Sequence, residues 1–374
     1  MKMLLVISLL SFLCLKPVGL SQTTDVPTIS SAGMSIKGEV LATGLGIPWG
    51  FDFLSKQEII VTSRSGQMYL VNPKTRTSIK LAGLPAIYSR GQGGLLDVIK
   101  DPQFPKNRRI FFSYSIVHRG GNSVRLASAI LKKNRLTKLK ILFTAEPESS
   151  KNLHFGSRLA IDSKNFLFMT IGDRGERDRA QQLNNHGGKI IRLKLDGSIP
   201  KDNPFYNRKD SKPEIWSYGH RNPQGLTIHP ITKELWAQEH GPRGGDEINI
   251  VKKGKNYGWP KASYGKEYWG PSIGSKKVQG TVQPLYQFTP SIAPSGLAIY
   301  SGTEFPKWEG NIFSGAMKLT HINRLVMKKG KIIQEERLLD KWYQRVRNVK
   351  VGPKGHLYFT IDDGALIRLY RTSK

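Results

Sequence analysis

The side chains with the greatest capacity for chemistry stand in glycine-containing turns that lead into short apolar segments. At one common position of a repeated pattern, these turns carry Gln92, His154, Arg221, Asn222, Arg345 and Arg347. Asp173, Lys318 and the Gly241-Pro242 pair follow similar segments. Several arginines with a lysine suit a polyanionic ligand, because an arginine fork binds a carboxylate through two hydrogen bonds. One histidine near a carboxylate such as Asp173 suits a general base.

Each of these residues also has an interpretation without chemistry. An arginine is most often a solvated surface residue, and His154 on its own is better explained as a hydrogen-bonded structural histidine. The functional interpretation becomes the better one because these residues occupy the same position in successive repeats. They would therefore meet if the repeats were arranged around an axis. We therefore predict a ligand site in which His154 accepts a proton and the arginines bind anionic groups.

The elements that must position these residues are six copies of one short pattern. Each copy has an apolar triplet, a turn with polar residues or glycine, and an aromatic-rich segment with the composition of a strand. A four-stranded propeller blade needs roughly 40–50 residues, and longer intervals between copies leave room for inserted loops. The copies are marked by Trp49, Leu96, Leu159, Leu226, Leu297 and Val349, at intervals of 47, 63, 67, 71 and 52 residues.

The chain is therefore predicted to be all-β and to form a six-bladed β-propeller. Its 38 glycines and 21 prolines agree with many tight turns and few long helices. A single blade cannot bury both of its faces, so the copies are expected to stack radially into a closed ring. We expect closure near the termini, with the segment 365–370 joining the first blade. An irregular pair of β-sandwiches is the alternative, because the copies are degenerate.

The first residues, MKMLLVISLLSFLCLKPVGLSQ, have the features of a secretory signal peptide. A lysine precedes an apolar run that is too short to span a membrane, and small residues follow it. We divide the chain into a signal peptide at 1–21, an extended lead-in at 22–35 and a propeller at 36–374. A buried N-terminal strand is the alternative for the first segment. Export would place the protein in the periplasm or outside the cell, without its single cysteine, Cys14.

Positive charge dominates the composition, with 58 Lys and Arg against 28 Asp and Glu and a formal net charge of +30. Such a balance raises nucleic acid as a partner. The basic residues are nevertheless dispersed as singles and pairs, and no nucleic-acid recognition motif occurs, so we predict no nucleic-acid function. An acidic surface or an acidic protein partner is another explanation for the charge. We expect a monomer, and no later segment is apolar enough to span a bilayer.

Seven motifs, read together, indicate a family. Each is weak alone, whereas their order and spacing are specific. They are GQGGLLD at 91–97, HFGSRL at 154–159, IGDRGERDRAQ at 171–181, GKIIRLKLDGSIPKDNPF at 188–205, YGHRNPQGL at 218–226, GPRGGDEIN at 241–249 and GKNYGWP at 254–260. In these motifs the chain resembles the soluble quinoprotein glucose/sorbosone dehydrogenases, which include the aldose sugar dehydrogenases. The resemblance runs from about Leu41 to Tyr370.

The resemblance implies a propeller that uses pyrroloquinoline quinone (PQQ) and Ca²⁺. It implies that His154 is the catalytic base, that Asp173 orients it, and that Arg221 lies beside the reactive carbonyl of the quinone. The remaining cofactor contacts would be Gln92, Asn222, Lys318, Arg345 and Arg347. Calcium would be bound by the backbone carbonyls of Gly241 and Pro242, while Asp246 and Glu247 match positions near a structural calcium.

The implied reaction is oxidation of an aldose at C1 to an aldonolactone, with electrons passed to an external acceptor such as an acidic redox protein. Two other functions stay open. A calcium-dependent propeller lactonase would need side-chain carboxylates around the channel metal, and a non-catalytic propeller would bind a protein or glycan without needing His154. The connection between the fifth and sixth copies is short, which favours the broader aldose dehydrogenases over the glucose enzymes and leaves the sugar open.

Overall fold

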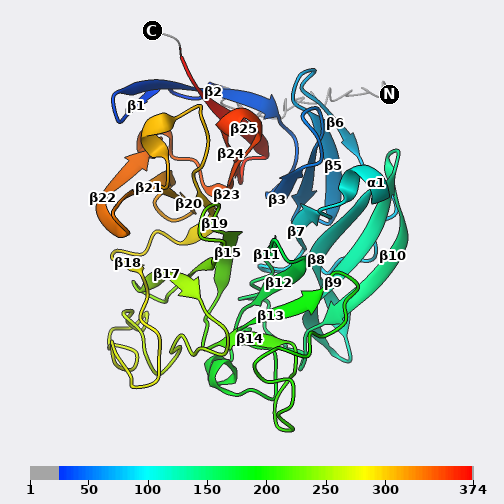
Figure 1. The fold of residues 1–374 in the computed structure, drawn as a ribbon, viewed down its shortest axis with the longest axis vertical. Coiled ribbons are helices and arrows are strands. Elements are labelled where there is room, and N and C mark those ends of the chain that lie inside the picture. The colour runs from blue at the N-terminus through cyan, green and yellow to red at the C-terminus, as the bar shows by residue number, and fades with distance from the viewer. Residues whose placement is uncertain (1–24, 373–374) are drawn as a thin grey trace, which may run out of the picture.

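The computed structural model describes residues 25–372, which form β-sheets arranged around a central axis (Figure 1). The predicted signal peptide and Cys14 lie outside these described residues. Within residues 25–372, no helix is long and apolar enough to cross a membrane. The helices in this range are one-turn elements, namely α1 (Phe104–Asn107) and the 3-10 helices η1 (Arg177–Gln181), η2 (Pro306–Trp308), η3 (Asp340–Trp342) and η4 (Pro353–Gly355).

Six antiparallel sheets follow one another along the chain. The first contains β3 (Pro48–Phe53), β4 (Ile59–Ser63), β5 (Gln67–Asn72) and β6 (Thr77–Lys80). The second contains β7 (Leu95–Lys100), β8 (Arg109–His118), β9 (Gly121–Lys132) and β10 (Arg135–Thr144). The third contains β11 (Leu159–Ile161), β12 (Phe166–Ile171), β13 (Lys189–Lys194) and β14 (Ile215–Tyr218).

The remaining three sheets repeat this meander. The fourth contains β15 (Pro223–Ile228), β16 (Leu235–Glu239), β17 (Asp246–Val251) and β18 (Tyr286–Phe288). The fifth contains β19 (Pro294–Ile299), β20 (Ile312–Ala316), β21 (His321–Lys328) and β22 (Lys331–Leu338). The sixth contains β23 (Val346–Val351), β24 (Leu357–Ile361), β25 (Ala365–Arg371), β2 (Met34–Ala42) and β1 (Ile29–Ser31).

The prediction of an all-β, six-bladed propeller is confirmed. The six marker residues of the sequence repeat lie on β3, β7, β11, β15, β19 and β23, the first strand of each blade. These strands are neighbours around the central axis, where they form the inner wall of the ring (Figure 1). The turns that precede them therefore meet at one end of the axis.

The N-terminal strands close the ring, in the direction opposite to our expectation. We expected the segment 365–370 to join the first blade, but β25 stays in the sixth blade and β2 pairs alongside it, for example with Val40 opposite Ile367. β1 then pairs with β2 at the outer edge. Part of the expected lead-in, from Ile29 onward, is thus a component of the last sheet.

Both faces of the blades are buried, which explains the apolar triplets of the sequence repeat. The second strands β4 and β24 are buried at every position. Between the second and third blades, Leu96 and Phe111 pack in one cluster with Leu167 and Ile191, and all four are 0% exposed. Strands covered on both sides read as continuous apolar runs instead of alternating ones.

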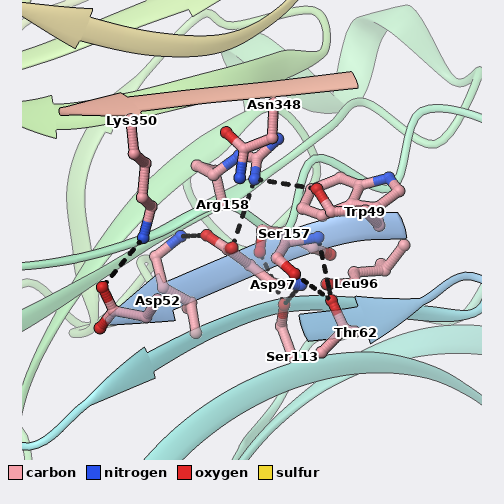
Figure 2. A network of polar contacts seen from close by, with 12 residues as sticks. Trp49, Asp52, Thr62, Leu96, Asp97, Ser113, Ser157, Arg158, Asn348 and Lys350 are labelled. Carbon is pink, nitrogen blue, oxygen red and sulfur yellow. Dashed lines mark hydrogen bonds and ion pairs between the residues drawn. The ribbon is translucent and has the colours of Figure 1, made fainter. Parts of the chain in front are cut away.

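Each blade is joined to the next by a hydrogen bond from a polar side chain to the carbonyl of an inner-strand residue or of the turn leading into it. All six donors are 0% exposed, and most of them lie on the second strand of their blade. The donor–acceptor pairs are Thr62–Leu96, Ser113–Ser157, Thr170–Pro223, Gln238–Ser295, Ser295–Val346 and Thr360–Pro48. Figure 2 shows the first two of these junctions.

Thr170→Val tests the contribution of one junction. Thr170 Oγ1 donates to the carbonyl of Pro223 at 2.9 Å and accepts from the backbone N–H of Arg158 at 2.9 Å. Valine keeps the shape but leaves both buried groups unpaired, so we expect the free energy of unfolding to fall by about 1–3 kcal/mol. Chemical denaturation measures it. Thr77→Val on the exposed strand β6 is the control, and an equal effect of both substitutions would contradict the junction's role.

Candidate active site

His154 and Asp173 form a hydrogen-bonded pair at the end of the axis where the inner strands begin. His154 precedes β11 and Asp173 follows β12; these two strands pair antiparallel, so the two loops lie at the same end of the blade. His154 Nδ1 and Asp173 Oδ1 are 2.6 Å apart. His154 has a φ of 51°, in the left-handed region that is strained for residues other than glycine. Such strain persists where surrounding contacts hold the residue in place.

Asp173 is fixed by three donors from separate parts of the chain. Besides His154, the backbone N–H of Gly175 donates to Oδ1 at 2.7 Å and the indole N–H of Trp259 donates to Oδ2 at 2.8 Å. Trp259 comes from the long loop between β17 and β18 and is 6% exposed. The carboxylate therefore holds Nδ1 of the imidazole as the protonated nitrogen, which leaves Nε2 with a lone pair.

The environment keeps this imidazole neutral. Burial lowers the pKa of His154 from its usual 6.5, and the nearby guanidinium of Arg221 lowers it further, although the hydrogen bond with Asp173 opposes both effects. For Asp173, burial alone would raise the pKa, but the hydrogen bonds from His154 and Gly175 lower it below its usual value. The pair is thus a neutral histidine oriented by an ionised carboxylate.

Arg221, Asn222 and Gln92 join this pair from two other blades. The carbonyl of Arg221 accepts the backbone N–H of Asp173 at 2.8 Å, and Asn222 Oδ1 accepts the N–H of Gly156 at 3.2 Å. Gln92 Oε1 accepts the backbone N–H of His154 at 2.8 Å. The second, third and fourth blades therefore position His154 together, through the turns that precede their inner strands.

The guanidinium of Arg221 is itself held in place. Its Nη1 donates to the carbonyls of His240 and Gly241 at 3.1 and 2.8 Å, and its charge lies 5.3 Å from the ring centre of Trp259. The backbone N–H of Arg221 donates to Glu239 at 2.6 Å. Arg221 is 9% exposed, so its charge is fixed close to His154 without being freely solvated.

His240 links this group to the sixth blade. Burial lowers the pKa of His240 to about 3, with further lowering by the charges of Arg221, His154 and Arg347. His240 Nε2 is buried and has no hydrogen-bond partner among residues 25–372. An unpartnered buried nitrogen at this place indicates a position where a ligand atom would be accommodated.

The predicted cationic residues Arg345 and Arg347 lie together around one carboxylate. Arg347 makes two hydrogen bonds of 2.8 Å to Asp362, and Arg345 Nε makes one of 2.9 Å. Burial lowers the pKa of the Arg64 guanidinium, and the nearby charge of Arg347 lowers it further. Arg345 Nη1 donates to the carbonyl of Met317, the residue before the exposed Lys318. Two guanidinium groups thus share one acid, which leaves positive charge for an anionic ligand.

The predicted calcium ligands divide into two kinds. Gly241 and Pro242 form the turn after β16, and the Gly241 carbonyl is the one that Arg221 contacts. Asp246 is already hydrogen-bonded within the protein: Oδ1 accepts the N–H of Gly241 at 2.8 Å, and Oδ2 accepts from Ser291 Oγ at 2.6 Å and from two backbone N–H groups. Asp246 therefore fixes the Gly241 turn against the loop before β19.

Glu247 has a different environment. Burial raises its pKa well above the usual value, and the neighbouring carboxylate of Glu239 raises it further. A hollow of about 10 Å³, the size of one water molecule or ion, is lined by residues that include Glu239, Gly241 and Glu247. Among the described residues, no group of three or more His, Cys, Asp or Glu side chains is arranged to hold a metal ion.

Sequence reasoning assigned no role to three residues that hold the site together. Trp259 stands in the GKNYGWP motif, but nothing in the sequence indicates that its indole reaches Asp173. Glu239 ends an apolar strand and binds both His220 Nδ1, at 2.9 Å, and Arg221 N. His240 follows it in the chain. The signal available in the sequence was the adjacent pair of polar residues, Glu239 and His240, at the end of an apolar run.

The chain is similar to known proteins over most of its length. The family described as glucose/sorbosone dehydrogenase matches residues 45–368. The chain is 40% identical over 342 residues to the aldose sugar dehydrogenase YliI of Escherichia coli, covering 90% of this chain and 92% of that protein.

Solved structures give the same result. The apo form of the soluble aldose sugar dehydrogenase from Escherichia coli has a TM-score of 0.87 at 39% identity, covering 91% of this chain and all (100%) of that one. The PQQ-bound aldose sugar dehydrogenase from Streptomyces coelicolor has a TM-score of 0.75 at 25% identity, covering 92% and 100%. The expected resemblance is thereby confirmed, and the chain belongs to the glucose/sorbosone dehydrogenase family.

Proposed function

We propose that this protein oxidises aldose sugars at C1 to aldonolactones, with PQQ and Ca²⁺ as cofactors and an external electron acceptor. The observation that carries the proposal is the His154–Asp173 pair, 2.6 Å apart, next to the fixed charge of Arg221. A base of lowered pKa beside a fixed cation suits removal of a hydroxyl proton while negative charge develops nearby. The sugar dehydrogenase names of the relatives support the same reaction class.

The residues present fit an anionic quinone. Arg345, Arg347 and Lys318 would bind its acidic groups, since the first two share Asp362 and retain net positive charge. Gln92, Asn222 and Arg221 would contact it from the opposite side, and His240 Nε2 is a buried nitrogen still without a partner in the described chain. When bound, PQQ would supply the two-electron acceptor for the hydride that leaves C1 of the sugar.

The residues also fit calcium in part. Gly241 and Pro242 offer backbone carbonyl oxygens, and Glu247 offers a carboxylate whose repulsion from Glu239 a cation would relieve. Asp246 would contribute through Oδ1, which accepts one protein hydrogen bond, whereas its Oδ2 already accepts three. Calcium would supply Lewis-acid stabilisation of developing negative charge.

His154 takes the chemical role in the proposed reaction. Its Nε2 accepts the proton of the anomeric hydroxyl, and Asp173 stabilises the imidazolium that results. Arg221 places a fixed positive charge where the electron density of the broken C–H bond moves. Trp259 keeps Asp173 in place through the indole hydrogen bond and covers the pair from water.

The remaining expectations belong to this proposal as well. We propose export to the periplasm or the outside of the cell, a monomeric state, and an acidic redox protein as an acceptor that would complement the net charge of +30. The whole proposal is tested by reconstituting the purified protein with PQQ and Ca²⁺ and measuring dye reduction with a panel of aldoses. Absence of turnover with every aldose, although both cofactors are bound, would reject it.

Replacement of the base gives the most direct kinetic prediction. In His154→Ala the cationic residues are untouched, so PQQ should still bind, while kcat should fall by at least the ~10²–10⁴-fold typical of a lost general base. Asp173→Asn should cause a smaller loss, because the imidazole remains. Steady-state dye reduction with fully loaded enzyme measures both. Near-normal kcat in His154→Ala would make His154 a structural residue.

The cationic residues give an equilibrium prediction. Neutralising Lys318, Arg345 or Arg347 with Gln removes a charge-assisted bond worth roughly 1.5–3 kcal/mol, so PQQ should bind about ten- to a hundredfold more weakly. Titration of the apoprotein with PQQ measures the dissociation constant. Lys328→Gln, at the outer end of β21, is the charge-matched control. If all three site variants bind PQQ as the control does, the anion site lies elsewhere.

The lowered pKa of His154 sets the pH dependence. The base works when neutral, which holds above its pKa, and that pKa lies below the usual 6.5. The acid limb of kcat/KM should therefore fall below pH 6.5, with activity maintained through pH 7. A profile measured at constant ionic strength with loaded enzyme checks this. A limb centred above pH 7 would mean that another group titrates or that His154 is stabilised as a cation.

A further inference from the structure

A second chamber occupies the central axis at the end opposite the candidate active site. It has a volume of about 330 Å³ and is lined by residues from all six inner strands. The inner strands begin at the active-site end, so residues late in these strands mark the opposite end. These are Phe53, Ile99, Ile161, Ile228, Ile299 and Val351.

Arg158 and Asn348 line the inner part of this chamber and are 2% and 1% exposed. Arg158 stands four residues after His154, at the end of the turn that leads into β11. Its Nε donates to the carbonyl of Gln224 at 2.9 Å, and Nη1 makes long contacts of 3.3 Å to Asp97 and 3.4 Å to the carbonyl of Trp49. These contacts are drawn in part in Figure 2.

Two buried donors near this inner end lack partners. Arg158 Nη2 and Asn348 Nδ2 make no hydrogen bond within the part of the chain that the structure describes. A buried donor without an acceptor destabilises the protein, and more so when it carries charge. Both atoms are N–H donors, so the complementary ligand group is an acceptor, and a carboxylate offers two oxygens to such a pair.

The outer part of the chamber is polar as well. Lys350, two residues after Asn348 on β23, lies 3.6 Å from Asp52 on β3, and both side chains are partly exposed (Figure 2). Thr227 also contributes to the lining. A cation near the entrance assists entry of an anion, while the hydroxyl and carboxylate groups can bind ligand hydroxyls. The volume lies at the lower end of the range for small-molecule sites.

We propose that this chamber is a second, non-catalytic site that binds a small hydrophilic carboxylate of the hydroxy-acid type. Its carboxylate accepts hydrogen bonds from Arg158 Nη2 and Asn348 Nδ2, and its hydroxyl groups face Asp52, Thr227 and Lys350. The ligand joins β11 and β23 across the axis and therefore stabilises the ring. The inference does not depend on the proposed oxidation of sugars, because the chamber lies at the other end of the axis.

Gluconate and sorbitol are matched probes, since they have similar size and hydroxyl content but only gluconate carries a carboxylate. With the purified full chain, we expect gluconate to raise the melting temperature in a saturable way and to give a measurable dissociation constant by calorimetry. Sorbitol should do neither at equal concentration. Equal effects of the two compounds would overturn the proposal, because they would show no recognition of the carboxylate.

Asn348→Asp converts the neutral donor into an anionic acceptor of the same shape, so gluconate should bind at least tenfold more weakly. Asn134→Asp, at an exposed turn, carries the same charge change and should bind gluconate normally. If Asn348→Asp does not fold, Lys350→Met at the entrance carries the test and should weaken binding severalfold. Binding that survives both chamber substitutions but is lost in Arg345→Gln would assign gluconate to the active-site end and overturn the proposal.

Discussion

The buried contacts of Arg158 with Asp97 and the surrounding carbonyls are the interaction on which the centre of this propeller depends. Arg158 reaches Asp97 on β7, Trp49 on β3 and Gln224 on β15, and its charge lies 4.0 Å from the ring centre of Trp49. Asp97 in turn accepts the backbone N–H of Leu159 at 2.9 Å. Leaving either charge alone in this interior would be strongly destabilising, so the four inner strands must keep their relative positions.

That central constraint also determines where the chemistry is placed. His154 lies four residues before Arg158, and the intervening Ser157 is held by Ser113 across the blade junction. Each inner strand is fixed near its start by a comparable contact, so the preceding turns are presented at defined positions. The strained φ of His154 becomes tolerable because the turn is fixed on both sides, by Gln92 and by this junction.

The sequence was sufficient for the architecture because one physical need recurs six times. Every inner strand packs against its neighbours through an apolar segment, and every turn before it can carry a polar group. The pairing of His154 with Asp173 was predictable for a similar reason, since the short hairpin β11–β12 brings its two ends together. Trp259 was not predictable, because its approach to Asp173 depends on the path of a long irregular loop. The sequence did not predict that the N-terminal strand β2 joins the last blade, because β2 and β25 are both acceptable as the strand that closes the ring.

The active-site end differs from the rest of the molecule in how its buried charges are paired. Elsewhere, buried charges such as Arg324 have near acidic partners, here Glu336. At the active-site end, Arg345 and Arg347 share Asp362, and Arg221 donates its guanidinium hydrogen bonds to carbonyl oxygens. Burial lowers the pKa of both His154 and His240, and the charge of Arg221 lowers both further, which favours a neutral base. A stable ring can tolerate such a cluster, and local departures of this kind are expected where a protein binds a charged ligand. The same excess of guanidinium charge that disfavours protonated His154 would also be the charge that an anionic cofactor neutralises.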